Sequence, residues 1–565
     1  ASNMPALMEL RIRACHVRGS FVAKDNQAPA ISALHLMNEP AKFDYSRLAH
    51  PPVTFGHEKL KHQERIPAAR AYIEAHGLNE HFDGEHADLG IIVQGGLYNT
   101  LIRALQQFGL ADAFGESKIP LLVLNVTCPL VPEQIANFCA NKRGVLVMEE
   151  GQPEYIEQEI ATLLRRREVP TPLHGKDWLP QGGEYTAEVM AQGLLQFVNR
   201  YLAAPASHTS AANAAVPGIA DASATAGVQH WLQSNQARRA AVTQTLSAKG
   251  QALPARPPSF CVGCPERPVF SAIKLAQQDI GAVHVSADIG CHALGTFEPF
   301  STGHTILGYG MSLASRAGVS PSMQRRVLSI MGDGGFWHNG LLTGVQSALF
   351  NGDDAVLLIF KNGYTSATGT QDIISTPDDA AKLAAADKWQ SLAHTNQTIE
   401  RTLQGLGVKW MRTVHTYEVA KVRETLVDAF TSDFQGLKVI IAEGECQLER
   451  QRRIKPWIAS LLKKGERVQR VKYGVDEDVC NGDHACIRLS GCPTLTLKDN
   501  PDPLKVDPVA TVIDGCVGCG LCGENAHAAT LCPSFYRAEV VQNASLWERF
   551  MASVRGQVVR VLQPA

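Results

Sequence analysis

The chain has 565 residues, of which 45% are hydrophobic and 19% are charged. This length corresponds to several domains, and the composition is that of a folded rather than a disordered protein. The 53 basic and 55 acidic residues nearly cancel, so there is no general positive field to bind nucleic acid or an anionic membrane. No apolar run is long enough to span a bilayer and no secretory signal opens the chain, so we expect a cytoplasmic protein.

The first part of the chain predicts a strand at 7–12 and then an α/β domain over 52–202. The expected strands are 88–93, 120–126 and 144–148, and the expected helices are 100–108 and 154–164. Apolar runs that alternate with amphipathic stretches are typical of a parallel sheet covered by helices. Residues 203–257 are rich in Ala, Ser and Pro, and they predict a linker with one helix at 228–246.

A second α/β region is predicted over 258–470, with strands at 284–287, 326–331, 355–361 and 438–442. Asp333 lies in the run Met-Gly-Asp-Gly-Gly that ends one strand, and Asn362 ends the next, with the helical stretch 339–350 between them. A right-handed crossover brings both strand ends to one edge of the sheet. A carboxylate and an amide oxygen there suit a Mg²⁺ ion that carries a diphosphate. The alternative is an Asx turn at each strand end.

Seven of the 14 cysteines lie between Cys480 and Cys532. Cys516-x2-Cys519-x2-Cys522, with Cys532-Pro533 behind it, is the pattern of an iron–sulfur loop. In two-cluster ferredoxins the cysteine before proline serves the other cluster, so the first predicted ligand set is Cys492, Cys516, Cys519 and Cys522. The second set is Cys480, Cys486 and Cys532, with Asp483, His484 or no fourth ligand; the last case gives a three-iron cluster. A zinc ribbon is the alternative for the region.

The other cysteines give weaker signals. Cys261 and Cys264 have the spacing of zinc ligands, but no second pair follows at the distance of a zinc finger. Cys15, Cys128, Cys139 and Cys446 are expected to be buried small apolar residues.

Three stretches carry a resemblance to a known family. Gly-Asp-Gly followed one strand later by Asn is the thiamine diphosphate motif, although the usual Asn-Asn is Lys361-Asn362 here. The segment 259–267 (SFCVGCPER), and the loops at 288–291 with Thr296 and at 308–311, resemble the thiamine diphosphate domain of 2-oxoacid:ferredoxin oxidoreductases. With its order of domains, the chain resembles the large (alpha) subunit of indolepyruvate:ferredoxin oxidoreductase.

The resemblance implies specific site residues. Mg²⁺ would be held by Asp333, Asn362 and the carbonyl oxygen of Tyr364. The residues implied to bind the cofactor are Cys264, Asp288, Ile289, Gly290, Gly308, Met311, Gly332, Asp333, Gly334, Gly335, Asn362, Tyr364 and Thr365. Candidate acid–base groups beside these loops are His292, His304 and His338.

The resemblance also implies an α/β, multidomain architecture. Residues 1–51 would end a pyrimidine-binding domain, 52–202 would form a transketolase C-terminal-like domain, and 203–257 would be the linker. Residues 258–470 would form the thiamine diphosphate domain, 471–540 a double-cluster ferredoxin-like domain, and 541–565 a helical tail. In the family, the glutamate that activates the cofactor lies in the pyrimidine-binding domain. It cannot be named in this sequence, so we do not expect this chain to turn over alone.

The implied activity is oxidative decarboxylation of a 2-oxoacid, such as the arylpyruvate indolepyruvate, to an acyl-CoA and CO2. Electrons would pass through two iron–sulfur clusters to ferredoxin or a similar acceptor. The implied partners are coenzyme A and a smaller gamma-like (beta) subunit, in a heterotetramer of two large and two small subunits. Two alternatives stay open: a non-oxidative 2-oxoacid decarboxylase, and an electron-transfer subunit with an empty thiamine site.

Overall fold

The structure, a computed structural model, describes residues 2–10, 44–202, 222–248, 258–376, 397–504 and 507–562. The chain divides into two compact units, Ala1–Pro254 and Ala255–Ala565. A search of the described helices finds none with the length and apolar character that crossing a membrane requires.

The first unit is built on a five-stranded sheet in the order β1-β3-β2-β4-β5. Its strands are β1 (Glu80–Phe82), β2 (Leu89–Gln94), β3 (Leu121–Leu124), β4 (Gly144–Met148) and β5 (Leu173–His174). The central pairs are parallel, and the edge strand β1 is antiparallel to β3. Strand β2 forms because it is an unbroken run of apolar residues, which a strand buried on both faces requires.

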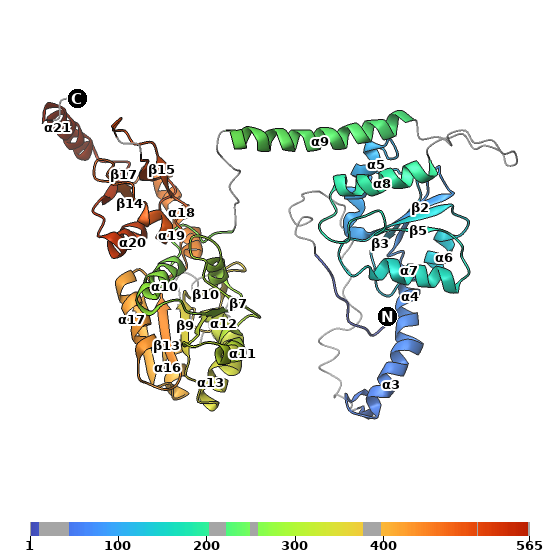
Figure 1. Cartoon of the computed structure of the whole chain (residues 1–565), viewed down its shortest axis with the longest axis horizontal. Coiled ribbons are helices and arrows are strands. Elements are labelled where there is room, and N and C mark those ends of the chain that lie inside the picture. Colours follow the sequence, from blue (N-terminus) through green and yellow to red (C-terminus); the bar gives the residue numbers. More distant parts are fainter. Residues whose placement is uncertain are drawn as a thin grey trace. The chain divides into compact units, whose positions relative to one another are not determined.

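Helices cover both faces of this sheet (Figure 1). α5 (Tyr98–Gln107), α8 (Ala187–Tyr201) and α9 (Ala222–Ala248) pack on one face, where Ile91 and Val93 point. α6 (Pro132–Cys139) and α7 (Tyr155–Arg166) pack on the other face, against Ile92. Alternate residues of one strand therefore enter different cores, as the pleat of a strand requires. Before the sheet lie η1 (Tyr45–Arg47), α3 (Val53–Leu60), η2 (Lys61–Arg65) and α4 (Ile66–Ala75); η3 (Gly95–Leu97) precedes α5.

One predicted element of this unit is wrong and another is confirmed. The predicted strand at 7–12 is wrong where it can be checked, because residues 7–10 have no regular structure and their large side chains are exposed; residues 11 and 12 lie outside the described range. Among the described residues no strand pairs with this run, and a lone strand cannot satisfy its backbone hydrogen-bonding groups. The predicted helix at 228–246 is present as α9, and its Val228 and Leu232 are buried in the core of the first unit.

The second unit opens with a six-stranded, fully parallel sheet in the order β12-β13-β9-β8-β6-β7. Its strands are β6 (Val285–Ala287), β7 (Thr305–Ile306), β8 (Leu328–Gly332), β9 (Val356–Lys361), β12 (Trp410–His415) and β13 (Lys438–Glu443). β8 and β9 are neighbours, and Gly332 lies opposite Phe360. The residues that follow them, Asp333 and Asn362, therefore leave the sheet at the same edge.

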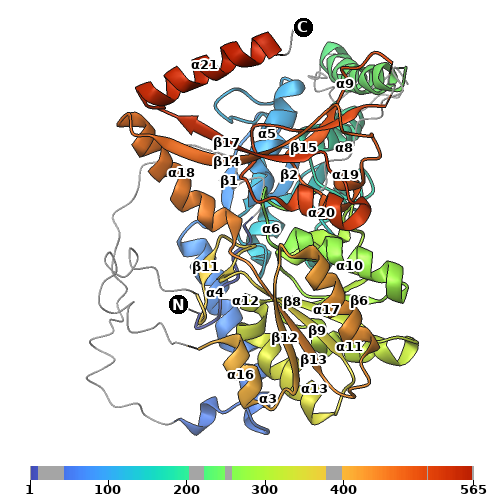
Figure 2. The same ribbon diagram turned by 90° about the vertical axis from the view of Figure 1, so that its left-hand side faces the viewer.

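Two helical layers cover this sheet, as Figure 2 shows. α10 (Glu266–Ile280) and α17 (Val419–Thr431) share a core with one face. The other face packs against α11 (Ser312–Val319), η6 (Phe336–Gln346) and α16 (Ile399–Gly405). The predicted helix at 339–350 is a π-helical stretch, η6, followed by α13 (Ser347–Phe350). Short elements complete this part: η4 (Cys291–Thr296), η5 (Ser320–Ser322), α12 (Asp333–Gly335), β10 (Tyr364–Thr365) and β11 (Gln371–Asp372).

The end of the second unit has two similar halves. Each half is a strand, a cysteine-bearing loop, a short helix and a strand, and the outer strands β14 (Val468–Val475) and β17 (Phe535–Gln542) pair antiparallel (Figure 2). The inner strands β15 (Leu495–Lys498) and β16 (Val509–Val512) also pair antiparallel. The helices between them, α19 (Ala485–Ser490) and α20 (Leu521–Thr530), pack together. α18 (Gln447–Lys463) precedes these halves and α21 (Leu546–Leu562) follows them.

Candidate functional site

Asp333 and Asn362 meet at the carboxyl edge of the sheet in the second unit. The Asp333 Oδ2 atom accepts hydrogen bonds from the backbone N–H groups of Asn362 at 2.9 Å and Gly363 at 2.6 Å. Its Oδ1 atom accepts one from the Gly334 N–H at 2.9 Å. Burial raises the pKa of Asp333 to about 7, although these donors favour the ionised form. A carboxylate therefore stands where two strands end, away from bulk water.

The Asn362 amide is held from both sides. Its Nδ2 donates to Glu266 Oε1 at 3.1 Å, and its Oδ1 accepts from the Tyr364 N–H at 3.1 Å and the Ser366 hydroxyl at 3.0 Å. Glu266 is buried, its Oε2 has no hydrogen-bond partner, and burial raises its pKa to about 7. Among the described residues neither Glu266 nor Asp333 forms an ion pair, so this edge of the sheet fits a divalent cation as counter-charge.

The loops after β6 and β7 complete this edge. Asp288 is fully buried, its Oδ2 accepts from the Gly310 N–H at 2.6 Å, and its Oδ1 is bonded to His292 Nε2. A side chain on Gly335 would have its Cβ atom 2.3 Å from Asp288 Oδ2. Gly310 has a φ of +74°, which disfavours any residue with a side chain. These glycines let three loops approach one another closely.

A second close approach surrounds Gly334. A Cβ atom there would lie 2.4 Å from the Tyr309 hydroxyl and 2.5 Å from Thr365 Oγ1. The same Tyr309 hydroxyl lies 3.2 Å from His338 Nδ1 and 3.3 Å from Thr365 Oγ1. Tyr309 was not predicted as a site residue, but it joins the Gly-Asp-Gly loop to Thr365.

The three predicted histidines occupy different environments. His292 is buried; burial alone would lower its pKa, but Asp288 outweighs this effect and raises it. His304 is exposed, and its Nδ1 accepts a hydrogen bond from the Val285 N–H at 3.0 Å. His338 is exposed beside Tyr309. Of the remaining predicted positions, Ile289 and Gly308 are exposed, whereas Gly290, Met311 and Gly332 are half-buried.

Four cysteines outside the tail line one pocket together with Glu266 and Asn362. They are Cys261, Cys264, Cys291 and Cys446. The pKa of Cys261 is raised by burial and then by the neighbouring Cys446 thiol, and that of Cys291 is raised by burial, Glu266 and both of these thiols. Four thiols around one pocket match in number the ligands that hold a four-iron cluster.

The sequence analysis missed this pocket. Cys261 and Cys264 have the spacing of zinc ligands, Cys264 is also implied to bind the cofactor, and Cys446 is expected to be a buried apolar residue. The available signal was that Cys291 and Cys446 each follow a strand of the parallel sheet, so both belong at its carboxyl edge. Cys139 and Cys446 are buried as expected, whereas the prediction for Cys128 is wrong because it is exposed on the loop after β3. Cys15 lies outside the described residues.

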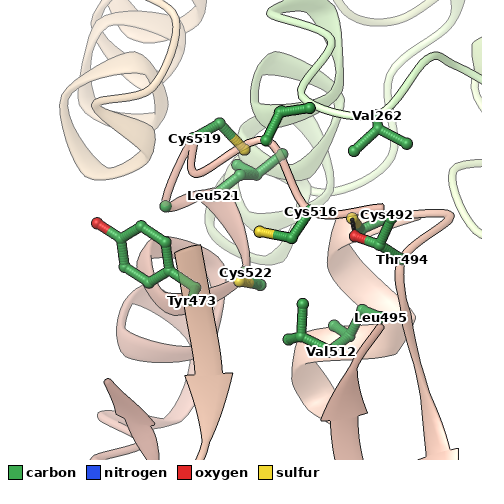
Figure 3. A pocket seen from close by; sticks show the side chains of 12 residues that line it. Val262, Tyr473, Cys492, Thr494, Leu495, Val512, Cys516, Cys519, Leu521 and Cys522 are labelled. Carbon is green, nitrogen blue, oxygen red and sulfur yellow. Dashed lines mark hydrogen bonds between the residues drawn. The ribbon is translucent and has the colours of Figure 1, made fainter. Parts of the chain in front are cut away.

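In the tail, the first predicted ligand set surrounds a small pocket (Figure 3). Cys516 and Cys519 come from the loop before α20, Cys522 from its first turn, and Cys492 from the loop after α19. Val262, Leu495, Val512 and Leu521 provide apolar walls. Burial and the neighbouring thiols of Cys519 and Cys492 together raise the pKa of Cys522 to about 12. Four crowded thiols in an apolar pocket fit a positively charged group such as iron.

The second predicted set is also gathered. Burial, together with the neighbouring Cys480, Cys532 and Asp483, raises the pKa of Cys486 to about 11. Asp483 is exposed, and its Oδ1 accepts a hydrogen bond from the Ala485 N–H at 3.0 Å. His484 Nε2 lies 2.8 Å from the Pro508 carbonyl oxygen.

No three His, Cys, Asp or Glu side chains in the described part of the chain converge as ligands of a single metal ion do. The thiolates of a four-iron cube bind different irons, so they stand around it rather than at one point. The Mg²⁺ set considered above contains only one carboxylate, because its other ligands are an amide and a carbonyl oxygen.

The second unit thus has a six-stranded parallel sheet with acidic and amide side chains at its carboxyl edge. Residues 280–442 match the family described as thiamine pyrophosphate enzyme, C-terminal TPP binding domain. This match and the parallel sheets confirm the predicted α/β fold class with a thiamine diphosphate domain.

More particular relatives cover most of the chain. Indolepyruvate oxidoreductase subunit IorA of Methanothermobacter thermautotrophicus is 24% identical over 94% of this chain and 73% of its own length. The proteins of the same name from Thermococcus kodakarensis and Archaeoglobus fulgidus are 25% and 26% identical, over 78% and 83% of this chain and 60% and 63% of their own lengths. These matches confirm the expected resemblance. A solved 2-oxoglutarate:ferredoxin oxidoreductase from Magnetococcus marinus is 13% identical, with a TM-score of 0.28 over 34% of this chain and 66% of that chain.

Proposed function

We propose that this chain is the large subunit of an oxidoreductase that decarboxylates a 2-oxoacid with thiamine diphosphate and passes the electrons to iron–sulfur clusters. The observation that carries the proposal is the bond between Asp333 and Asn362 at adjacent strand ends, in the same compact unit as three groups of thiols. The names of the relatives support indolepyruvate, an arylpyruvate, as the substrate.

The residues at the sheet edge would hold Mg²⁺ and the diphosphate. Asp333 and Asn362 supply side-chain oxygens, and Tyr364 supplies its carbonyl oxygen. Thiamine diphosphate, when bound, supplies an electron sink for the carbanion chemistry of a 2-oxoacid. The close approach of Gly334 and Gly335 to neighbouring loops leaves the backbone near the diphosphate. Asp288 holds His292 in a buried pair, where it can keep or release a proton without contact with bulk water.

The thiols would hold the iron–sulfur clusters that carry the electrons away. The pocket of Cys261, Cys264, Cys291 and Cys446 includes Asn362 in its wall, so a cluster there would lie next to the Mg²⁺ site. The electrons would then pass to a cluster at the first tail set, which includes Cys492, and to one at the second tail set, which includes Cys480. The two similar halves of the tail support a ferredoxin-like domain. We further propose coenzyme A as acyl acceptor, a smaller subunit as partner in the heterotetramer, and ferredoxin or a similar protein as electron acceptor.

The test is anaerobic reduction of a low-potential dye by the chain together with its partner subunit. A panel of 2-oxoacids would be offered with and without coenzyme A, beside the Asp333→Ala variant as control. We expect dye reduction by wild type with an arylpyruvate and none by the variant. Aldehyde release without dye reduction would identify a non-oxidative decarboxylase. Failure of the isolated wild-type chain to bind thiamine diphosphate and Mg²⁺ in calorimetry would leave only an electron-transfer role.

Iron analysis provides a second test. The two tail sets predict about eight irons per chain, or about seven if the second set holds three, and a cluster in the pocket beside Asn362 adds about four. Only about four irons in total would contradict the proposed electron path.

A further inference from the structure

Arg267 is a buried cation without an anionic partner. It lies in the first turn of α10, its exposed fraction is 0%, and its Nε and Nη2 atoms have no hydrogen-bond partner. Among the described residues it forms no ion pair with a carboxylate. An arginine stays charged at any physiological pH, so this side chain cannot avoid the cost of burial by losing its proton. A buried, unpaired charge is strongly destabilising unless an opposite charge compensates for it.

The contacts of Arg267 place it beside the first tail set of cysteines. Its Nη1 donates to the Ser490 carbonyl at 3.0 Å, and Ser490 is the last residue of α19, two positions before Cys492. Ser271, one turn further along α10, donates to the Leu489 carbonyl at 2.6 Å. α10 also packs against α20, which carries Cys522.

The thiols respond to this charge. At Cys492 burial raises the pKa, but the Arg267 guanidinium and the hydrogen bonds from Thr494 together outweigh burial and lower it. At Cys519, burial raises the pKa and Arg267 opposes the rise. The guanidinium is thus close enough to act on two of the four thiols in the pocket of Figure 3. No carboxylate of the described residues pairs with Arg267, so the charge that fits its unpaired nitrogens is that of a thiolate-bound cluster.

We propose that Arg267 is the counter-charge of the iron–sulfur cluster held by Cys492, Cys516, Cys519 and Cys522, and that it raises the reduction potential of this cluster. The inference rests on the proposed function, because it requires the cluster. Reduction adds one negative charge to the cluster, and a nearby fixed positive charge in a low-dielectric interior stabilises the reduced form. Arg267 would be a positioning residue, acting on the cluster through its field.

The test is a redox titration of the full-length chain, purified without oxygen and followed by electron paramagnetic resonance. Arg267→Gln keeps a donor for the Ser490 carbonyl but removes the charge, and Arg267→Lys keeps the charge. Ser271→Ala removes a neighbouring contact between the same helices and changes no charge. The cluster at Cys480, Cys486 and Cys532 provides an internal reference, because the charges that act most strongly on Cys486 are those of Cys480, Cys532 and Asp483.

We expect the potential of the Cys492 cluster to fall in Arg267→Gln and to stay near the wild-type value in Arg267→Lys and Ser271→Ala. The reference cluster should not shift in any variant. An unchanged potential in Arg267→Gln, with wild-type iron content, would overturn the inference and leave the proposed function intact. If Arg267→Gln cannot retain iron, Arg267→Lys still decides, because a large fall in its potential would show that the charge is not the cause. Wild-type protein without iron would overturn the proposed function as well.

Discussion

The Asp333 carboxylate accepts a hydrogen bond from the Asn362 backbone N–H at 2.9 Å, across the ends of two neighbouring parallel strands. This bond fixes the distance between the two side chains before any ligand binds. Glu266 lies on α10, which covers one face of the sheet, and its carboxyl group accepts a hydrogen bond from the Asn362 side-chain amide. Two buried carboxyl groups thus share one edge of the sheet, and their ionisation affects how stability depends on pH.

The stability of the ligand-free chain should fall as pH rises from about 4 to about 7. Burial raises the pKa of both Asp333 and Glu266 to about 7, whereas in the unfolded chain both lie near 4. In this window the folded state binds more protons than the unfolded state, so raising the pH favours unfolding. The measurement is the urea midpoint as a function of pH.

Glu266→Gln is the matched control for this pH effect, because the amide keeps the size of the carboxyl but cannot ionise. The variant should show a shallower fall over the same pH range. Equal slopes for wild type and variant would show that Glu266 is ionised across the whole range and contradict its raised pKa.

Gly334→Ala should weaken cofactor binding and destabilise the fold. The added Cβ atom would lie 2.4 Å from the Tyr309 hydroxyl and 2.5 Å from Thr365 Oγ1, and such overpacking costs about 1 to 3 kcal/mol. Calorimetric titration with thiamine diphosphate and Mg²⁺, beside thermal unfolding, would measure both effects.

The control for that substitution is Gly405→Ala at the end of α16. Nothing lies within 4 Å of a Cβ atom there, so alanine should leave binding unchanged and be neutral or slightly stabilising. If both variants lost cofactor affinity and stability to a similar extent, the contacts of Gly334 with Tyr309 and Thr365 would not be the reason that this position requires glycine.

The meeting of Asp333 and Asn362 could be predicted from the sequence because consecutive parallel strands with a helical crossover end at one edge. The tail cysteines could be predicted from their spacing on short loops. The sequence places Cys291 and Cys446 after strands, at the carboxyl edge, but not in one pocket with Cys261, because these thiols come from distant segments and meet only through the order of strands in the sheet. The secondary-structure propensity of a single segment does not determine the order of strands in a sheet.

Substituting two buried cysteines in turn tests whether that pocket holds an iron–sulfur cluster. Cys446→Ala should lower the iron content by up to four atoms per chain, since it removes one of four thiols around the pocket. Cys139→Ala, at an equally buried thiol in the first unit, should change only stability. Iron analysis after anaerobic purification distinguishes them. Equal iron contents would show that the pocket holds no cluster.

Asp483→Cys should make the second tail cluster more resistant to oxygen. Asp483 stands where a ferredoxin pattern has cysteine, next to Cys480 and Cys486. An oxygen ligand, or a missing fourth iron, makes such a site labile, and a fourth thiolate is the softer ligand that iron–sulfur clusters prefer. Iron content and the visible absorption band should therefore decay more slowly in air than in wild type. Asp478→Cys adds an exposed thiol to the same loop, outside the pattern, and should decay at the wild-type rate. If both variants decay alike, position 483 does not face the cluster, and His484 or an open site remains as the explanation for the missing cysteine.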